Sequence, residues 1–172
     1  MDIESAMWRG NAAGLGGFFA FFRFGTATAL VTNQRSFVGL VQTINQIGNV
    51  EPSTLLNCVG MAIDSSTANY SIQHNDGAGT CTLVPLGAGF PKDTTTAYEL
   101  YLYARPNAAE IRWMVINLAS GAIATGTITT DLPSATGLFC PQAWINTVAG
   151  STAVSLDLCR AYCEVPRLGN VM

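Results

Sequence analysis

Few residues of this chain have the types and spacing that enzymatic chemistry requires. Nucleophilic catalysis would need a base beside a serine or cysteine, and the single histidine, His74, borders a predicted turn, where we expect it to be solvated. Glycoside hydrolysis needs two carboxylates about 5–9.5 Å apart, which on a sandwich usually alternate along one strand. No predicted strand carries such a pair, because Glu99, Glu110 and Asp131 stand apart from other acids. We therefore expect no catalytic residues and a protein that is not an enzyme.

Two short segments combine residue types that suit ligand binding. Asn75 and Asp76 offer oxygen atoms to a hard cation such as calcium, but a calcium loop spaces three or more acids, so an ordinary hairpin turn is the alternative and no metal site is predicted. Trp144 and Asn146 place an indole ring and an amide at the end of a predicted strand, where they can stack on a sugar ring and bond its hydroxyls. The alternative for Trp144 is a core or interface position. These four are the candidate ligand-binding residues.

The sequence indicates no cofactor. It has no phosphate loop, dinucleotide fingerprint or zinc-ligand spacing, and the glycines at 14–17 precede a predicted strand rather than a helix. The five cysteines are an odd number without a CxxC pair. We expect reduced and mostly buried thiols.

Composition argues against two classes of partner. The 172 residues include 8 Lys+Arg and 11 Asp+Glu, and the charged fraction is 11%, where about 25% is typical. The basic residues are scattered and the net charge is −3, so we predict no nucleic-acid partner. No run of about 18 apolar residues indicates membrane insertion, and the acidic start at Met1–Ser5 lacks the features of a secretory signal.

The elements that must position these residues are strands. Runs rich in Val, Ile, Thr, Phe and Tyr alternate with clusters of Gly, Pro, Asn, Asp and Ser, and no window keeps a helical period. This pattern predicts an all-β, antiparallel sandwich or barrel of about ten strands, three of which form a meander between Ala97 and Thr130. The predicted strands are Phe18–Phe24, Ser36–Val41, Thr54–Asp64, Tyr70–His74, Thr80–Pro85, Ala97–Ala104, Ile111–Asn117, Ala122–Thr129, Gly137–Trp144 and Ala153–Val165.

Two predicted strands are apolar on both faces. Phe18–Phe24 and Ala97–Ala104 each carry large apolar side chains at both parities, unlike a sandwich strand with one wet face. The second face is covered either by the chain's own loops or by another subunit. Leaving a phenylalanine in water forgoes about 1.5–3 kcal/mol, so we expect a homotrimer. The residues expected at its interface are Phe19, Phe21, Tyr101 and Tyr103.

The chain is expected to form one domain. The predicted boundaries are an N-terminal arm at 1–13, a single sandwich domain at 14–166 and a C-terminal tail at 167–172.

An ordered set of segments resembles one protein family. The segments are Gly16–Phe19, Phe22–Gly25, Gln34–Leu40, Pro52–Gly60, His74–Gly77, Leu86–Pro91, Tyr98–Leu100, Thr130–Pro133 and Pro141–Trp144. Together they resemble a lectin-like (concanavalin A-like) β-sandwich domain from the C-terminal ends of tailed-phage tail fibres and from minor virion structural proteins. The resemblance implies a jelly roll whose first and last strands pair in one sheet.

The resemblance also implies a place on the virion. It suggests a phage virion surface structural protein, made in the cytoplasm of the host bacterium, commonly trimeric and in contact with other virion proteins. A fibre-tip or receptor-binding module that recognises host cell-surface polysaccharide is the leading hypothesis. The alternative is a capsid decoration (cement) protein that stabilises the shell. A fibre would carry a long N-terminal shaft, so a detached tip, a separate decoration protein and an excerpt of a longer polypeptide all stay open.

Overall fold

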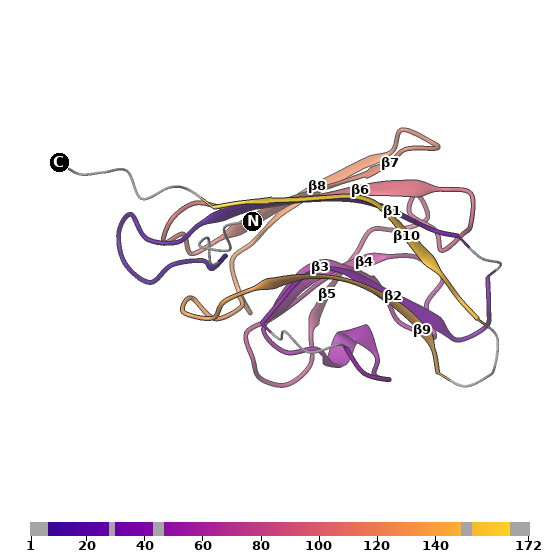
Figure 1. Ribbon diagram of the computed structural model, residues 1–172, viewed down its shortest axis with the longest axis horizontal. Helices are drawn as coiled ribbons and strands as arrows, with labels where there is room; N and C mark the ends of the chain where they lie inside the picture. The colour runs from indigo at the N-terminus through magenta and orange to yellow at the C-terminus, as the bar shows by residue number, and fades with distance from the viewer. Residues whose placement is uncertain (1–6, 28–29, 43–46, 149–152, 166–172) are drawn as a thin grey trace.

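The computed structural model describes residues 7–27, 30–42, 47–148 and 153–165, and its elements are strands apart from one short 3-10 helix. Figure 1 shows the strands in two layers. The elements are β1 (Phe18–Thr26), β2 (Gln34–Val41), η1 (Pro52–Thr54), β3 (Cys58–Ile63), β4 (Ser71–Asn75), β5 (Thr82–Pro85), β6 (Ala97–Ala104), β7 (Ile111–Asn117), β8 (Ile123–Ile128), β9 (Cys140–Thr147) and β10 (Leu156–Glu164).

The strands form two antiparallel sheets of five. The first sheet has the order β10-β1-β6-β7-β8 and the second has the order β5-β4-β3-β2-β9. The predicted meander is β6-β7-β8. The first and last strands, β1 and β10, pair with each other, as the resemblance implied. The predicted all-β sandwich of about ten strands is therefore confirmed.

Three predicted strands, those expected from Thr54, Gly137 and Ala153, begin at least three residues later than expected. The segment predicted as a strand from Thr54 starts within η1, and β3 begins only at Cys58. Pro52 fixes the backbone at the start of η1, and Asn57 has a φ of 48°, which a strand does not accommodate.

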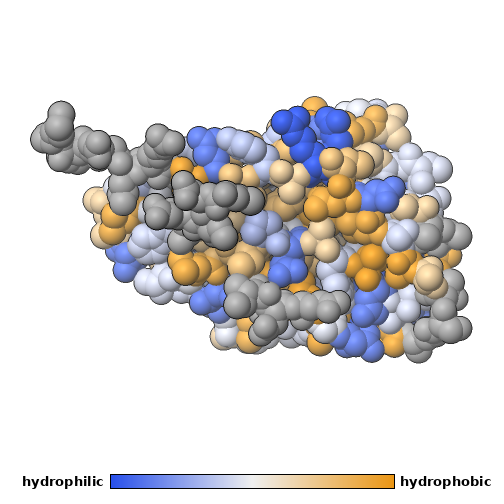
Figure 2. All heavy atoms as spheres, viewed as in Figure 1, coloured by the Kyte–Doolittle hydropathy of each residue, from blue (hydrophilic) through white to orange (hydrophobic). Residues whose placement is uncertain are grey.

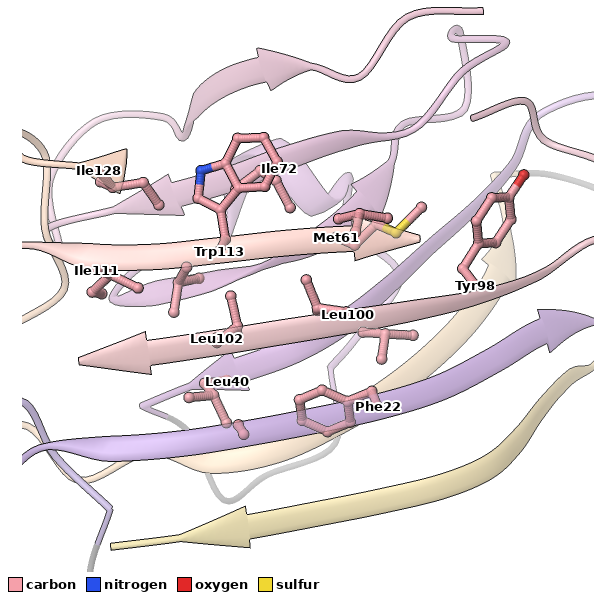
Figure 3. Close-up of a cluster of buried hydrophobic side chains, with 14 of the residues drawn as sticks. Phe22, Leu40, Met61, Ile72, Tyr98, Leu100, Leu102, Ile111, Trp113 and Ile128 are labelled. Carbon is pink, nitrogen blue, oxygen red and sulfur yellow. The ribbon is translucent and has the colours of Figure 1, made fainter. Parts of the chain in front are cut away.

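The main core lies between the two sheets. Figure 3 shows Phe22, Leu40 and Met61 pointing into it from both layers. In β1 the inward side chains include Phe18, Phe22 and Phe24, so Phe19 and Phe21 point outward. Trp113 packs across Gly126, where a Cβ atom would come within 2.5 Å of the indole ring.

The strand β10 is exposed along most of its length. It lies at the edge of the first sheet and pairs only with β1, so few neighbours cover it. Figure 2 shows apolar residues reaching the surface on the side that carries the edge strands β9 and β10. The expectation of mostly buried thiols is therefore wrong for Cys159 and Cys163, which are exposed, while Cys58 and Cys81 are buried.

The described part of the predicted arm packs onto the sandwich. Met7 forms a bridge with Phe139, and Trp8 forms one with Gly17. The rest of the arm (1–6) and the predicted tail (167–172) lie outside the described residues. The described part of the chain contains no helix of the length and hydrophobicity that crossing a bilayer requires.

Candidate functional site

The outer face of the second sheet is covered by the chain itself. A second apolar cluster forms where Phe37 and Trp144 lie against Ile47 and Leu55. Figure 1 shows η1 on this side, away from the first sheet. We call this surface, centred on Phe37, Val41, Ala62 and Trp144, the covered face.

The outer face of the first sheet carries a group of aromatic rings instead. We call it the aromatic face and define it by Phe19, Phe21, Tyr101, Tyr103 and Tyr162. The strand register places Phe21 between Tyr101 of β6 and Tyr162 of β10. The rings of Phe21 and Tyr101 lie 4.9 Å apart and those of Phe19 and Tyr162 lie 6.2 Å apart. Tyr103 and Tyr162 are 42% and 46% exposed, so part of this aromatic surface faces solvent.

A charged network borders these rings. The guanidinium of Arg23 donates from Nε to Glu99 Oε1 at 2.9 Å, and the Tyr101 hydroxyl donates to Glu99 Oε2 at 2.7 Å. Burial alone would raise the pKa of Glu99, but the hydrogen bonds from Tyr101 and Arg23 and the charge of Arg23 outweigh it and lower that pKa. Hydrogen bonding to Glu99 raises the pKa of Arg23. Glu99 is therefore held as a carboxylate with both oxygens engaged.

The network and the rings line a shallow depression of about 370 Å³. Three adjacent strands, β10, β1 and β6, contribute to it. The volume lies within the range of small-ligand sites, about 300–1,000 Å³. Aromatic surfaces beside ionic hydrogen-bonding groups can hold a ring that has one apolar face and polar substituents. The lining residues are Phe19, Phe21, Arg23, Glu99, Tyr101, Arg160 and Tyr162.

A second depression, of about 470 Å³, lies at the edge of the covered face and contains two of the predicted ligand-binding residues, Trp144 and Asn146. Trp144 is only 9% exposed, and the guanidinium of Arg35 lies 5.9 Å from its ring centre. Arg35 in turn donates to Glu51 Oε1 at 3.1 Å. The indole is thus largely engaged within the fold, which leaves less of it for a ligand than the rings of the aromatic face.

The other predicted pair, Asn75 and Asp76, lies elsewhere on the second sheet. The Asn75 side chain is buried, accepts hydrogen bonds from the backbone N–H groups of Asn57 and Gly77, and donates to the carbonyl of Ala78. Asp76 is exposed. Strands β3 and β2 separate this turn from Trp144 in β9, so the structure does not bring the two pairs together. Among the described residues, no three His, Cys, Asp or Glu side chains cluster to hold a metal.

His74 differs from the expectation of a solvated turn residue. It is buried in β4, with Nδ1 3.0 Å from the carbonyl oxygen of Asp131. Asp131 adopts a φ of 47° and accepts hydrogen bonds from the backbone of Asp76 and Thr82. The segment that carries Asp131 therefore closes over the histidine.

The structure does bring together the four residues expected at a subunit interface. Phe19, Phe21, Tyr101 and Tyr103 all belong to the aromatic face. Sequence reasoning missed Arg160 and Tyr162. Their alternation with Glu164 along β10 was the available signal, but it has meaning only once β10 is paired with β1.

Comparison with known proteins supports the fold class. No protein-family model matches the sequence, and no curated protein matches it. Among solved structures, peanut lectin has a TM-score of 0.55 at 12% identity, over 88% of this chain and 73% of the lectin. The CBM2 module of the evolved Dit of Lactobacillus casei BL23 phage J-1 has a TM-score of 0.53 at 13% identity, over 86% of this chain. The chain spans 60% of the length of that phage structure. The protein is a lectin-like β-sandwich.

The same comparison corrects the expectation that the chain is not an enzyme. A carbohydrate esterase from the Shiga toxin-encoding bacteriophage phi24B has a TM-score of 0.47 at 16% identity, over 91% of this chain and 72% of the esterase. An alginate lyase at 12% identity and a glutamic peptidase at 10% identity are also among the structural neighbours. The absence of paired acids on one strand does not exclude an enzyme, because a sheet face gathers groups from neighbouring strands, as it does Arg23 and Glu99.

Proposed function

We propose that the protein is a glycan-recognition module of a phage virion surface and that the depression on the aromatic face is its binding site. The observation that carries this proposal is the placement of partly exposed aromatic rings beside the network of Arg23, Glu99 and Tyr101. The phage origin is supported by the ordered family resemblance. The likeness to a phage module and to a lectin supports the fold on which the proposal builds.

The lining residues have separate parts in binding. Phe19 and Tyr162 supply apolar surface for the carbon face of a sugar ring. Arg23 has a side chain that is 47% exposed, and a guanidinium carries five N–H donors, so donors beyond those directed at Glu99 remain for sugar hydroxyls. Since the network is already formed without ligand, binding costs little ordering of these side chains.

The proposal is tested by binding to immobilised polysaccharides from bacterial surfaces, measured by biolayer interferometry. We expect Tyr162→Ser to weaken binding about tenfold or more, because it removes a stacking surface from the depression. The matched control is Ile123→Ser, which removes an exposed apolar side chain from the same sheet, outside the depression. Equal binding by both variants would contradict the assigned site. Release of sugar fragments that is lost in Glu99→Gln would make the function catalytic rather than recognition alone.

A second candidate function uses the same face. Subunit interfaces are enriched in aromatic residues, and the aromatic face has that composition. A homotrimer joined through Phe19, Phe21, Tyr101 and Tyr103 would suit a capsid decoration protein, and its neighbours would cover the depression. Immunogold labelling of intact virions distinguishes the two: labelled tails favour recognition, and labelled capsids favour decoration.

A further inference from the structure

Arg160 is a charged group of the depression that has no ion-pair partner among the described residues. It is exposed in the middle of β10 and lies directly across from Arg23 of β1. Glu99 neutralises Arg23, but no carboxylate lies within 4.0 Å of the Arg160 guanidinium in the described part of the chain. The acids of β10, Asp157 and Glu164, lie roughly 10 and 13 Å from it along the strand, at about 3.3 Å per residue.

The residues that line the depression carry more positive than negative charge, and Glu164 borders it by accepting a hydrogen bond from the lining Tyr162 at 2.9 Å. Its lining holds two guanidinium groups and one carboxylate, whereas the whole chain has a net charge of −3. Two neighbouring arginines with a single counter-charge favour an anion from outside. A guanidinium binds a carboxylate or a phosphate through two parallel hydrogen bonds.

We propose that the site binds an anionic polysaccharide, with Arg160 contacting a carboxylate or phosphate of the polymer while Tyr162 and Phe19 contact a sugar ring. This inference rests on the proposed function and adds the chemical class of the glycan. A neutral sugar would use the rings and the Arg23–Glu99 network but would leave the Arg160 charge unpaired. The anion is thus the part of the ligand that Arg160 selects.

The experiment compares acidic polysaccharides with their neutral counterparts. A panel of uronic-acid polymers is immobilised next to the same polymers after carboxyl reduction, together with a phosphate-bearing teichoic acid and a neutral glucan. Binding is measured for the wild-type chain, for Arg160→Gln and for Arg105→Gln. Arg105 is a matched control because it is an exposed arginine outside the depression and its loss changes the net charge equally.

We expect the wild-type chain to bind at least one anionic polymer about tenfold or more tightly than its neutral counterparts, and added salt to weaken that binding. Arg160→Gln should remove most of this preference and Arg105→Gln should keep it. Preference for a uronic-acid polymer identifies a carboxylate, and preference for the teichoic acid identifies a phosphate. Equal binding to native and neutral polymers, or an unchanged preference in Arg160→Gln, would overturn the inference while leaving glycan recognition intact. Absence of binding to every polymer would overturn both.

Discussion

The two outer faces of this sandwich differ in how far other parts of the chain cover them. Both are built from strands whose outward positions include large aromatic side chains, Phe37 and Trp144 on one and Phe19 and Tyr101 on the other. On the covered face, Ile47 and Leu55 lie over these side chains and complete a small core. On the aromatic face, tyrosine side chains stay partly exposed. Whether an outward-facing side chain is buried therefore depends on the segments that pack over that face of the sheet, and not on the strand that carries the side chain.

The arginines of the two faces show the functional consequence. Arg35 on the covered face has a side chain that is 4% exposed, and it binds Glu51 and Asn49, so it holds the covering segment in place. Arg23 on the aromatic face keeps nearly half of its side chain in solvent. A buried arginine whose terminal nitrogens bind within the chain serves the fold, whereas an exposed one beside an ordered carboxylate is available to a ligand.

The largest effect should follow from removing a ring on the covered face. Phe37→Ala should lower the free energy of unfolding by about 3–5 kcal/mol, because Phe37 is fully buried in the second cluster. Tyr103→Ala on the aromatic face should cost much less, about 0.5–1 kcal/mol, because the Tyr103 side chain is 42% exposed. Urea denaturation of both variants measures the difference. Equal losses would mean that the two faces are equally buried in solution.

The alkylation rates of the cysteine thiols should also differ between the covered face and the exposed strand β10. Cys58 and Cys81 lie beneath the covered face with their sulfur atoms 3.5 Å apart, and the hydrogen bond between them, followed by burial, raises the pKa of Cys58 well above its ordinary value. Because the thiolate is the reactive form and burial keeps reagents from both sulfur atoms, we expect these two to react about 100-fold more slowly than exposed Cys159. Burial raises the pKa of the Cys163 thiol, so its rate should lie between these. Mass spectrometry of samples taken during alkylation measures the rate at each cysteine. Unfolding the protein in urea should make these rates equal. Rapid labelling of Cys58 in the folded protein would contradict the burial.

The oligomeric state tests what covers the aromatic face. If the aromatic face joins a homotrimer, as the decoration alternative requires, the trimer should persist at tens of micromolar. Phe21→Asp should then weaken it about tenfold or more, because the change places an unpaired charge at the interface, whereas Phe21 itself is only 9% exposed in one chain. Sedimentation velocity measures both. A wild-type chain that stays monomeric would contradict the trimer and leave the face to a ligand.

The smallest effect concerns acid stability. The pKa values of Glu51 and Glu99 are both lowered, because hydrogen bonds from Ser65 and Arg35 to the first, and from Tyr101 and Arg23 to the second, outweigh the cost of burial. Each carboxylate therefore contributes stability that is fully present above the unfolded-state pKa, about 4.3, and is lost as the pH falls through the lower folded-state pKa. Glu51→Gln and Glu99→Gln should each flatten the fall in unfolding free energy between about pH 5 and 2. An unchanged slope would show that the carboxylate is not engaged in solution.

Local patterns in the sequence predicted the strands well, because alternating side chains and turn residues act over short distances. The hairpin turns carry positive φ angles at Gly77, Asn107 and Gly121, each of which lies between two consecutive predicted strands. The start of β3 was missed because Pro52 and Asn57 act against a run of otherwise strand-forming residues.

The candidate site was only partly predictable. The parity of β1 grouped Phe19 and Phe21 with Arg23, but periodicity alone did not say which group faces the core. Arg160 joins the site through the pairing of β10 with β1, a long-range contact that the residue pattern of neither strand contains. The expectation that His74 is solvated was wrong because its burial also depends on a long-range contact. The residue that covers it, Asp131, is distant in sequence.

The position of β1 also governs when the protein can fold during synthesis. β1 emerges first from the ribosome but lies between β6 and β10 in its sheet, so one edge stays unpaired until the last strand has been made. Pairings between segments this distant form slowly, and unpaired apolar strands tend to aggregate while they wait. The phenylalanine-rich start of the sandwich is thus exposed while the strands between β1 and β10 are translated, and the yield of native protein in the cell should depend on chaperones that shield it.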